Sequence, residues 1–270
     1  MDVKKVLFIS QEIDPYLPAS EFSTFAKDLA QGLQEKGAEV RSFMPKYGAI
    51  NERRNQLHEV IRLSGLNIII DDCDHPLIIK VATLQPSRLQ VYFIDNDDYF
   101  YRHSPGKMET VDWAELNDER SIFFVRGTVE TVKKLRWEAD IVQCIGWITA
   151  LTPLYLKKIY NEDPSFRNSK IVYSLTKDGF EGNLDPRMVD KLKQEGFTDE
   201  QLASLTAGDT PVDFVKLNKI AIDNADAIIE STDSVLPELV EYAKASGKPF
   251  LPYTPSDDPS AAYTEFYRSL

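Results

Sequence analysis

The chain opens with two short apolar runs separated by a helical pattern, and this order constrains the fold more than any other feature. Residues 6–10 and 40–44 have the composition of strands that are buried on both faces. Between them, apolar residues recur at helical spacing after Ser20, which can cap a helix, and Gly37 ends the pattern where glycine is favoured. This strand–helix–strand order predicts a βαβ unit with parallel strands and a right-handed crossover.

The same alternation returns in the second half of the chain. Helices are expected at 121–136, 149–159, 215–224 and 237–245, and strands at 141–144, 171–175 and 227–230. Residues 250–252 are expected to form an edge strand, and about 258–270 a terminal helix. Short apolar runs between about 59 and 94 predict a β-hairpin or meander insertion. We therefore expect one α/β domain over residues 1–270, built on a Rossmann-like, doubly wound parallel sheet.

Composition excludes several classes of function. The 270 residues carry a formal net charge of −12, which opposes binding to nucleic acid and to anionic membranes. Two cysteines and three histidines predict neither a disulfide framework nor a metal centre. The first residues lead straight into a strand pattern, with too few apolar residues for a signal peptide or a membrane span. We expect a cytoplasmic protein with no cofactor, no metal, and no nucleic-acid or membrane partner.

Several segments share their order and spacing with one known family. They are KKVLFISQEIDP, EKGAEVRSFMPKYGAI, VYFIDNDDYFYR, the long segment 119–157, KIVYSLTKDGFEG and LNKIAIDNADAIIESTDSVLPEL. Together, over roughly residues 4–240, they resemble the bacterial glycogen synthases and plant starch synthases of glycosyltransferase family 5.

The resemblance implies one half of a GT-B fold, in which two Rossmann-like domains face each other across a cleft. In that family the first domain binds the growing α-1,4-glucan, and the second holds most of the ADP-glucose. The present sequence resembles the first, N-terminal domain and ends where the second should begin. Its terminal helix is expected to pack on the single domain.

The family's phosphate-binding loop is replaced in this sequence. The family places Lys-Thr-Gly-Gly-Leu-Gly-Asp after its first strand, where glycines let the backbone approach a diphosphate at a helix N-terminus. The aligned residues here are 18–24. Pro18 removes both the cation and an N–H donor, and Glu21 adds an anion that repels a diphosphate but favours the helix dipole. A capped structural helix is therefore expected instead of a nucleotide site.

Two further motifs have lost their reactive groups. The family's His-x-His-Asp-Trp-His-Thr aligns with residues 143–149, where only Trp147 and Thr149 are retained. The family's central histidine lines the acceptor side of the reaction centre, and isoleucine cannot exchange a proton. The Ile-His-Asn motif aligns with residues 175–177, Leu-Thr-Lys. We predict no catalytic and no cofactor-binding residue.

Some candidate binding residues remain. Aromatic side chains gather near one loop at Tyr99, Phe100, Tyr101 and Trp113. They could form a glucan-stacking platform, a partner surface or a lid on the insertion. Glu12 is retained from the first-strand exit, and Trp147 could stack on a sugar or simply pack. The predicted substrate-binding residues of a vestigial cleft are Glu12, Tyr99, Trp147 and Thr149.

Two other side chains could react but are expected not to. His103 lies in an acidic, aromatic loop, and a lone histidine of this kind is more often inert than a general base. Cys144 is expected to be a small buried hydrophobe and not a nucleophile.

Three functions remain open. We favour a glycogen/starch synthase-like domain linked to storage-glucan metabolism, without independent glucosyltransferase activity, that binds an α-glucan or a protein partner. The second is an active ADP- or UDP-glucose:α-1,4-glucan glucosyltransferase completed by a second chain, which Glu12 permits and the loop at 18–24 opposes. The third is a small-molecule binder on a remade α/β crevice. The sequence does not indicate the oligomeric state.

Overall fold

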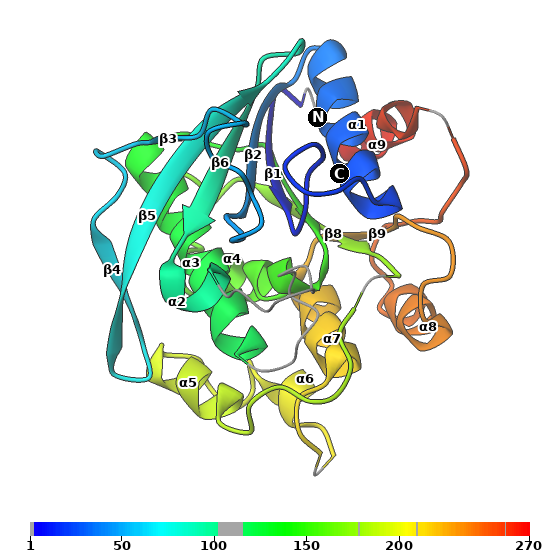
Figure 1. Ribbon diagram of the computed structural model, residues 1–270. Coiled ribbons are helices and arrows are strands. Elements are labelled where there is room, and N and C mark those ends of the chain that lie inside the picture. Colours follow the sequence, from blue (N-terminus) through cyan, green and yellow to red (C-terminus); the bar gives the residue numbers. More distant parts are fainter. Residues whose placement is uncertain (1–2, 102–115, 178, 209, 257) are drawn as a thin grey trace.

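The computed structural model describes residues 3–101, 116–177, 179–208, 210–256 and 258–270. Within them the chain forms one ten-stranded sheet with helices on both faces (Figure 1). The strands that pair in parallel are, in spatial order, β10 (Phe250–Leu251), β9 (Ala227–Glu230), β8 (Lys170–Leu175), β7 (Ile141–Ile145), β1 (Lys5–Ser10), β2 (Glu39–Pro45) and β6 (Leu89–Asp95). The direction of winding reverses between β1 and β7. This is the expected doubly wound α/β arrangement.

The opening βαβ unit forms as predicted. β1 and β2 pair in parallel, and α1 (Glu21–Glu35) connects them. The Ser20 hydroxyl accepts a hydrogen bond from the Ser23 N–H at 2.9 Å, and the Ser23 hydroxyl accepts one from the Ser20 N–H at 2.9 Å. This reciprocal cap confirms the predicted start of the helix. Gly37, just beyond the helix end, has φ +95°, a conformation that favours glycine.

The β insertion is shorter than the sequence suggests. Its antiparallel strands are β3 (His58–Glu59), β4 (Leu66–Ile70) and β5 (Cys73–Leu84). The run that we assigned to the end of the insertion is β6, which pairs with β5 in antiparallel fashion but with β2 in parallel. β6 therefore belongs to the main sheet. The apolar run alone could not reveal this, because it predicts a strand but not the direction of its neighbour.

The expected helices are present in the second half. They are α3 (Asn117–Leu135), α4 (Thr152–Lys158), α7 (Phe214–Asn224), α8 (Pro237–Ala245) and α9 (Pro259–Ser269). The helix expected at 149–159 begins later, because a 3-10 turn, η1 (Trp147–Thr149), precedes it and Pro153 lies in the first turn of α4. The sequence reading missed α2 (Asp97–Phe100), α5 (Met188–Gln194) and α6 (Ala203–Thr206), which are too short to show a helical period. In the described part of the chain, no helix has both the length and the apolar character needed to cross a membrane.

The terminal helix packs on the domain, as expected. α9 lies beside α1 on one face of the sheet, whereas α3, α4 and α7 cover the other (Figure 1). A Cβ added at Gly32 of α1 would lie 2.7 Å from the Ser260 Cβ, so the close approach of the two helices requires glycine. Tyr267 of α9 is 0% exposed, and its hydroxyl donates to Gln143 Oε1 of β7 at 2.6 Å. This buried hydrogen bond ties α9 to the sheet.

We predict that Tyr267→Phe lowers the free energy of unfolding by about 1–3 kcal/mol, because it leaves the buried Gln143 oxygen without its donor. Tyr242→Phe is the matched control. The Tyr242 hydroxyl donates to Asp223 at 2.9 Å in an exposed position, where water replaces the lost partner. Urea unfolding monitored by circular dichroism measures both losses. Equal losses for the two variants would contradict the proposed role of the buried bond.

Candidate functional site

The segments that replace the three family motifs meet at the carboxyl ends of the central strands. They follow β1, β7 and β8, beside the point where the winding of the sheet reverses. The Gln11 N–H donates to the Ile145 carbonyl at 3.1 Å, which joins the first segment to the second. Glu21, at the start of α1, contacts Lys177 beyond β8, which joins the first to the third. Ligands of open α/β sheets bind in a crevice at this position.

An ion pair occupies the N-terminus of α1. The Glu21 carboxylate pairs with the Lys177 ammonium, and an Asp233 carboxylate oxygen lies 4.0 Å from the same nitrogen. The Lys177 N–H donates to Thr232 Oγ1 at 2.9 Å, which holds the lysine backbone at the end of β8. A carboxylate in the first turn is favourable at the positive end of the helix dipole. The N-terminus of α1 thus carries the protein's own anion, Glu21, paired with a lysine.

The segment after β7 is packed into the core. Residues 143–149 are all buried. Gly146 has φ +89° and ψ 151°, a combination that is essentially restricted to glycine. A Cβ at Gly146 would lie 2.7 Å from the Gln11 Cβ, 3.0 Å from Gln11 Oε1 and 3.1 Å from the ring of Phe22. The position aligned with the family's aspartate therefore has no room for a side chain unless Gln11 moves.

Trp147 and Thr149, two of the predicted binding residues, are buried in η1. Trp147 is 1% exposed, and its ring packs edge-on against Phe180 with 4.7 Å between the ring centroids. The Thr149 hydroxyl donates to the Gly146 carbonyl at 2.7 Å. Both side chains serve local packing in this structure. Their role in substrate binding stays a prediction.

Tyr99 is also buried, in contrast to Tyr101. Tyr99 is 2% exposed, and its hydroxyl donates to Glu119 Oε2 at 2.8 Å and lies 2.9 Å from His75 Nε2. Burial and the Glu119 carboxylate hold the pKa of Tyr99 well above its usual range. Glu119 also accepts a hydrogen bond from the Lys191 ammonium at 2.6 Å. Tyr99 therefore belongs to a polar network that joins β5, α3 and α5, and its use in sugar binding stays a prediction.

The remaining aromatic and acidic candidates are spread over different environments. Phe100 is buried, whereas Tyr101 is 47% exposed. Glu12 is half-buried after β1, where its backbone carbonyl accepts a hydrogen bond from the Ser10 hydroxyl at 2.8 Å, and its binding role stays a prediction. Trp113 and His103 lie outside the described residues. Tyr101 is thus the exposed ring of the predicted cluster in the described part of the chain.

The sequence reading missed a charged cluster at the ends of β2 and β6. Glu52 Oε1 lies 2.8 Å from the Lys46 ammonium and 2.7 Å from the Lys80 ammonium. Lys80 also lies 2.8 Å from Asp95 Oδ2. Burial raises the pKa of the Asp95 carboxyl, although Lys80 acts to lower it. These partners lie on separate elements, and no local motif connects them, so only the folded chain reveals the cluster.

The described residues offer neither a metal centre nor a reactive thiol at this site. Among them, no group of three or more His, Cys, Asp or Glu side chains could hold a metal ion. Cys144 is 0% exposed, and burial raises the pKa of its thiol well above its usual range. This agrees with the expectation that Cys144 is a buried hydrophobe.

Comparisons with known proteins identify relatives of the whole domain. A family model described as the starch synthase catalytic domain matches residues 5–247. A glycogen synthase from Chlorobium chlorochromatii is 38% identical over 182 residues, which cover 67% of this chain and 37% of the relative. A glycogen synthase from Chlorobium phaeovibrioides is 34% identical over 242 residues, which cover 88% and 48%. The chain therefore spans less than half the length of these relatives.

A solved structure shows the same fold. It is the catalytic domain of starch synthase IV from Arabidopsis thaliana bound to ADP and acarbose. The superposition has a TM-score of 0.72 at 18% sequence identity and covers 96% of this chain and 52% of the other. This likeness confirms the expected half of a GT-B fold.

We predict that Gly146→Ala destabilises the protein by more than Gly37→Ala does. Both glycines have positive φ, +89° and +95°, but a Cβ at Gly37 meets nothing within 4 Å, whereas one at Gly146 meets Gln11. Gly37→Ala should cost about 1 kcal/mol from backbone strain alone, and Gly146→Ala about 2–4 kcal/mol from strain and overpacking together. Urea unfolding measures both. Similar losses would show that the segment after β7 is not tightly packed.

Proposed function

The chain belongs to the family of starch synthase catalytic domains, and we propose that it is a glucan-binding member without independent glucosyltransferase activity. The observation that carries this proposal is the ion pair between Glu21 and Lys177 at the N-terminus of α1.

The residues at the start of α1 disfavour the binding of a sugar nucleotide. A diphosphate at the start of α1 would have to displace Glu21 from Lys177 and then lie beside the carboxylate. The Glu21 side chain is 60% exposed, so water screens this repulsion to about 1 kcal/mol at a separation of about 4 Å. The Ser23 N–H, a donor that could bind phosphate, already donates to the Ser20 hydroxyl. Pro18 contributes no N–H donor to the loop.

The segment 143–149 lacks the family's histidines and aspartate, which could exchange a proton. In the segment 143–149 the aligned histidines and aspartate are replaced by Gln143, Ile145, Gly146 and Ile148, all of which are buried. A general acid or base must reach the reacting atom within hydrogen-bond distance. Restoring one residue would not reopen this segment, because Gly146 packs directly against Gln11.

An α-glucan is the ligand that such a domain would retain. The family resemblance implies that the first domain binds the growing α-1,4-glucan, and this role does not depend on the altered nucleotide loop. Tyr101, which is exposed at the same edge of the sheet, offers a ring for stacking. Glucan binding without donor chemistry is therefore the function that we favour over catalysis.

We predict no glucose transfer by this chain. Purified protein, incubated with radiolabelled ADP-glucose or UDP-glucose and glycogen, should incorporate no more label than a heat-inactivated sample. The glycogen synthase of Chlorobium chlorochromatii serves as the positive control. The assay is repeated in host lysate, with and without the chain. Incorporation that depends on the chain, alone or in lysate, would contradict the proposal and support an active enzyme.

We predict that glycogen retards the protein in native affinity electrophoresis. Tyr101→Ala should reduce the retardation, because it removes the exposed ring. Tyr242→Ala, which removes a ring on α8 on the far side of the domain, is the control and should migrate like the unaltered protein. No retardation with glycogen or maltooligosaccharide would exclude glucan binding. Capture of a protein partner in its place would favour a role in protein assembly.

A further inference from the structure

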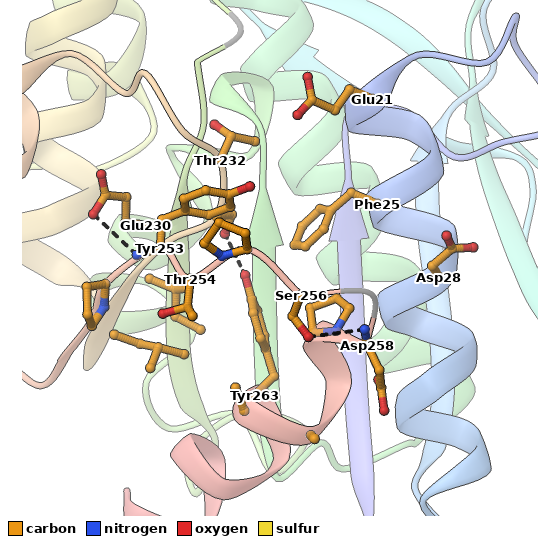
Figure 2. A pocket seen from close by; sticks show the side chains of 18 of the residues that line it. Glu21, Phe25, Asp28, Glu230, Thr232, Tyr253, Thr254, Ser256, Asp258 and Tyr263 are labelled. Atoms are coloured by element: carbon orange, nitrogen blue, oxygen red, sulfur yellow. Dashed lines mark hydrogen bonds between the residues drawn. The ribbon is translucent and has the colours of Figure 1, made fainter.

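A cavity of about 590 Å³ lies between α1, the ends of β9 and β10, and α9 (Figure 2). Figure 2 shows the rings of Phe25 and Tyr253 in its lining, and the carboxylates of Glu230 and Asp28 at its outer ends, turned away from those rings. These four side chains do not meet around one ligand. By contrast, contacts from several elements converge on the exposed ring of Tyr101, beyond the ends of β2 and β6.

The backbone around Tyr101 is held from two sides. Tyr101 directly follows α2, and its N–H donates to the Asp97 carbonyl at 3.3 Å, which closes the last turn of that helix. The Phe100 carbonyl accepts a hydrogen bond from the Gly48 N–H at 2.7 Å, in the chain that follows β2. Phe100 is buried, and its ring packs edge-on against Tyr47 with 6.0 Å between the ring centroids. The place of the Tyr101 backbone is therefore set by its neighbours.

The ring of Tyr101 lies on a buried ammonium group. Lys46 Nζ is 5.5 Å from the centroid of the Tyr101 ring, which is within the range of a cation–π contact. The Lys46 side chain is only 6% exposed, so the ammonium lies on the inner side of a ring that is itself exposed. Because little water reaches the lysine, its attraction to the ring is stronger than that between two surface groups.

The Lys46 ammonium is itself anchored by charge. Glu52 Oε1 lies 2.8 Å from it and 2.7 Å from the Lys80 ammonium. The Lys80 ammonium also lies 2.8 Å from Asp95 Oδ2. Burial acts to raise the pKa of the Glu52 carboxyl, but hydrogen bonds from Lys46 and Lys80 hold that pKa below its usual range. Glu52 therefore stays ionised at neutral pH and keeps the Lys46 ammonium in one place beneath the ring.

We propose that Lys46 is a positioning residue, which holds the ring of Tyr101 in one orientation for stacking on a glucose unit. A ring that is already ordered loses less side-chain entropy when a ligand binds, so it contributes more to the affinity. This inference deepens the proposed glucan binding and rests on it for the identity of the ligand. The contact between the lysine and the ring is a separate matter, because it can be measured without any glucan.

The first test observes the ring directly, by nuclear magnetic resonance of the full chain with isotope-labelled tyrosine rings and no ligand. The Tyr101 signals are assigned by their loss in Tyr101→Phe. Lys46→Met keeps an unbranched side chain but removes the charge, so it should shift the Tyr101 signals toward those of a freely exposed tyrosine. Glu52→Gln leaves the lysine in place and weakens its anchor, so it should shift the same signals by a smaller amount.

Lys133→Met is the matched control. Lys133 also lies over a tyrosine, with Nζ 4.9 Å from the centroid of the Tyr160 ring, but it is in the last turn of α3, at the opposite edge of the sheet. This variant removes the same charge and should leave the Tyr101 signals unchanged. Tyr101 signals that stay in place in Lys46→Met, or that move equally in Lys133→Met, would overturn the inference.

The second test measures glycogen binding by the same variants in native affinity electrophoresis. Lys46→Met should raise the apparent dissociation constant about threefold, as expected when a binding side chain loses one restraint, and Lys133→Met should not change it. Equal retardation of Lys46→Met and the unaltered protein would overturn the positioning role and leave glucan binding intact. If glycogen does not retard the unaltered protein, glucan binding is refuted. In that case, Tyr101 signals that move in Lys46→Met alone would still support the hold of Lys46 on the ring, and signals that stay in place would refute it as well.

Discussion

The burial of β1 between two parallel neighbours is the constraint on which the rest of the structure depends. Its residues Val6, Leu7, Phe8 and Ile9 are all 0% exposed. β1 pairs with β2 on one side and with β7 on the other. Parallel neighbours must be reached through crossovers, so α1 has to begin at the carboxyl edge of the sheet. The N-terminus of α1 is thereby fixed beside the segments that follow β7 and β8.

At that edge the protein fills the crevice with its own side chains. Glu21 supplies the anion and Lys177 the cation that pairs with it, while Gln11 and Phe22 close over Gly146. The scaffold of the family is thus retained, and these side chains occupy part of the crevice. Beside it, α9 and the chain after β10 enclose a separate cavity, whose described lining includes four acidic residues.

Local patterns in the sequence were sufficient to predict many of the helices and strands. They were not sufficient to predict the long-range contacts between them. β9 (Ala227–Glu230) and α8 (Pro237–Ala245) have the predicted bounds, because apolar period and flanking breakers lie within each segment. The expected anion at Glu21 was correct, but its partner Lys177 is 156 residues away in sequence, and no motif connects them. The parallel pairing of β6 was missed for the same reason. The burial of Trp147 and Tyr99 likewise depends on neighbours such as Phe180 and Glu119, which only the folded chain brings close.

Isothermal titration of ADP into the full chain tests the central claim most directly, since ADP carries the diphosphate without the sugar. If the N-terminus of α1 is already occupied by Glu21 and its partner Lys177, the titration should give no saturable heat. Saturable binding of ADP that Lys177→Ala abolishes would contradict the account. The lysine would then hold phosphate in preference to the carboxylate of Glu21.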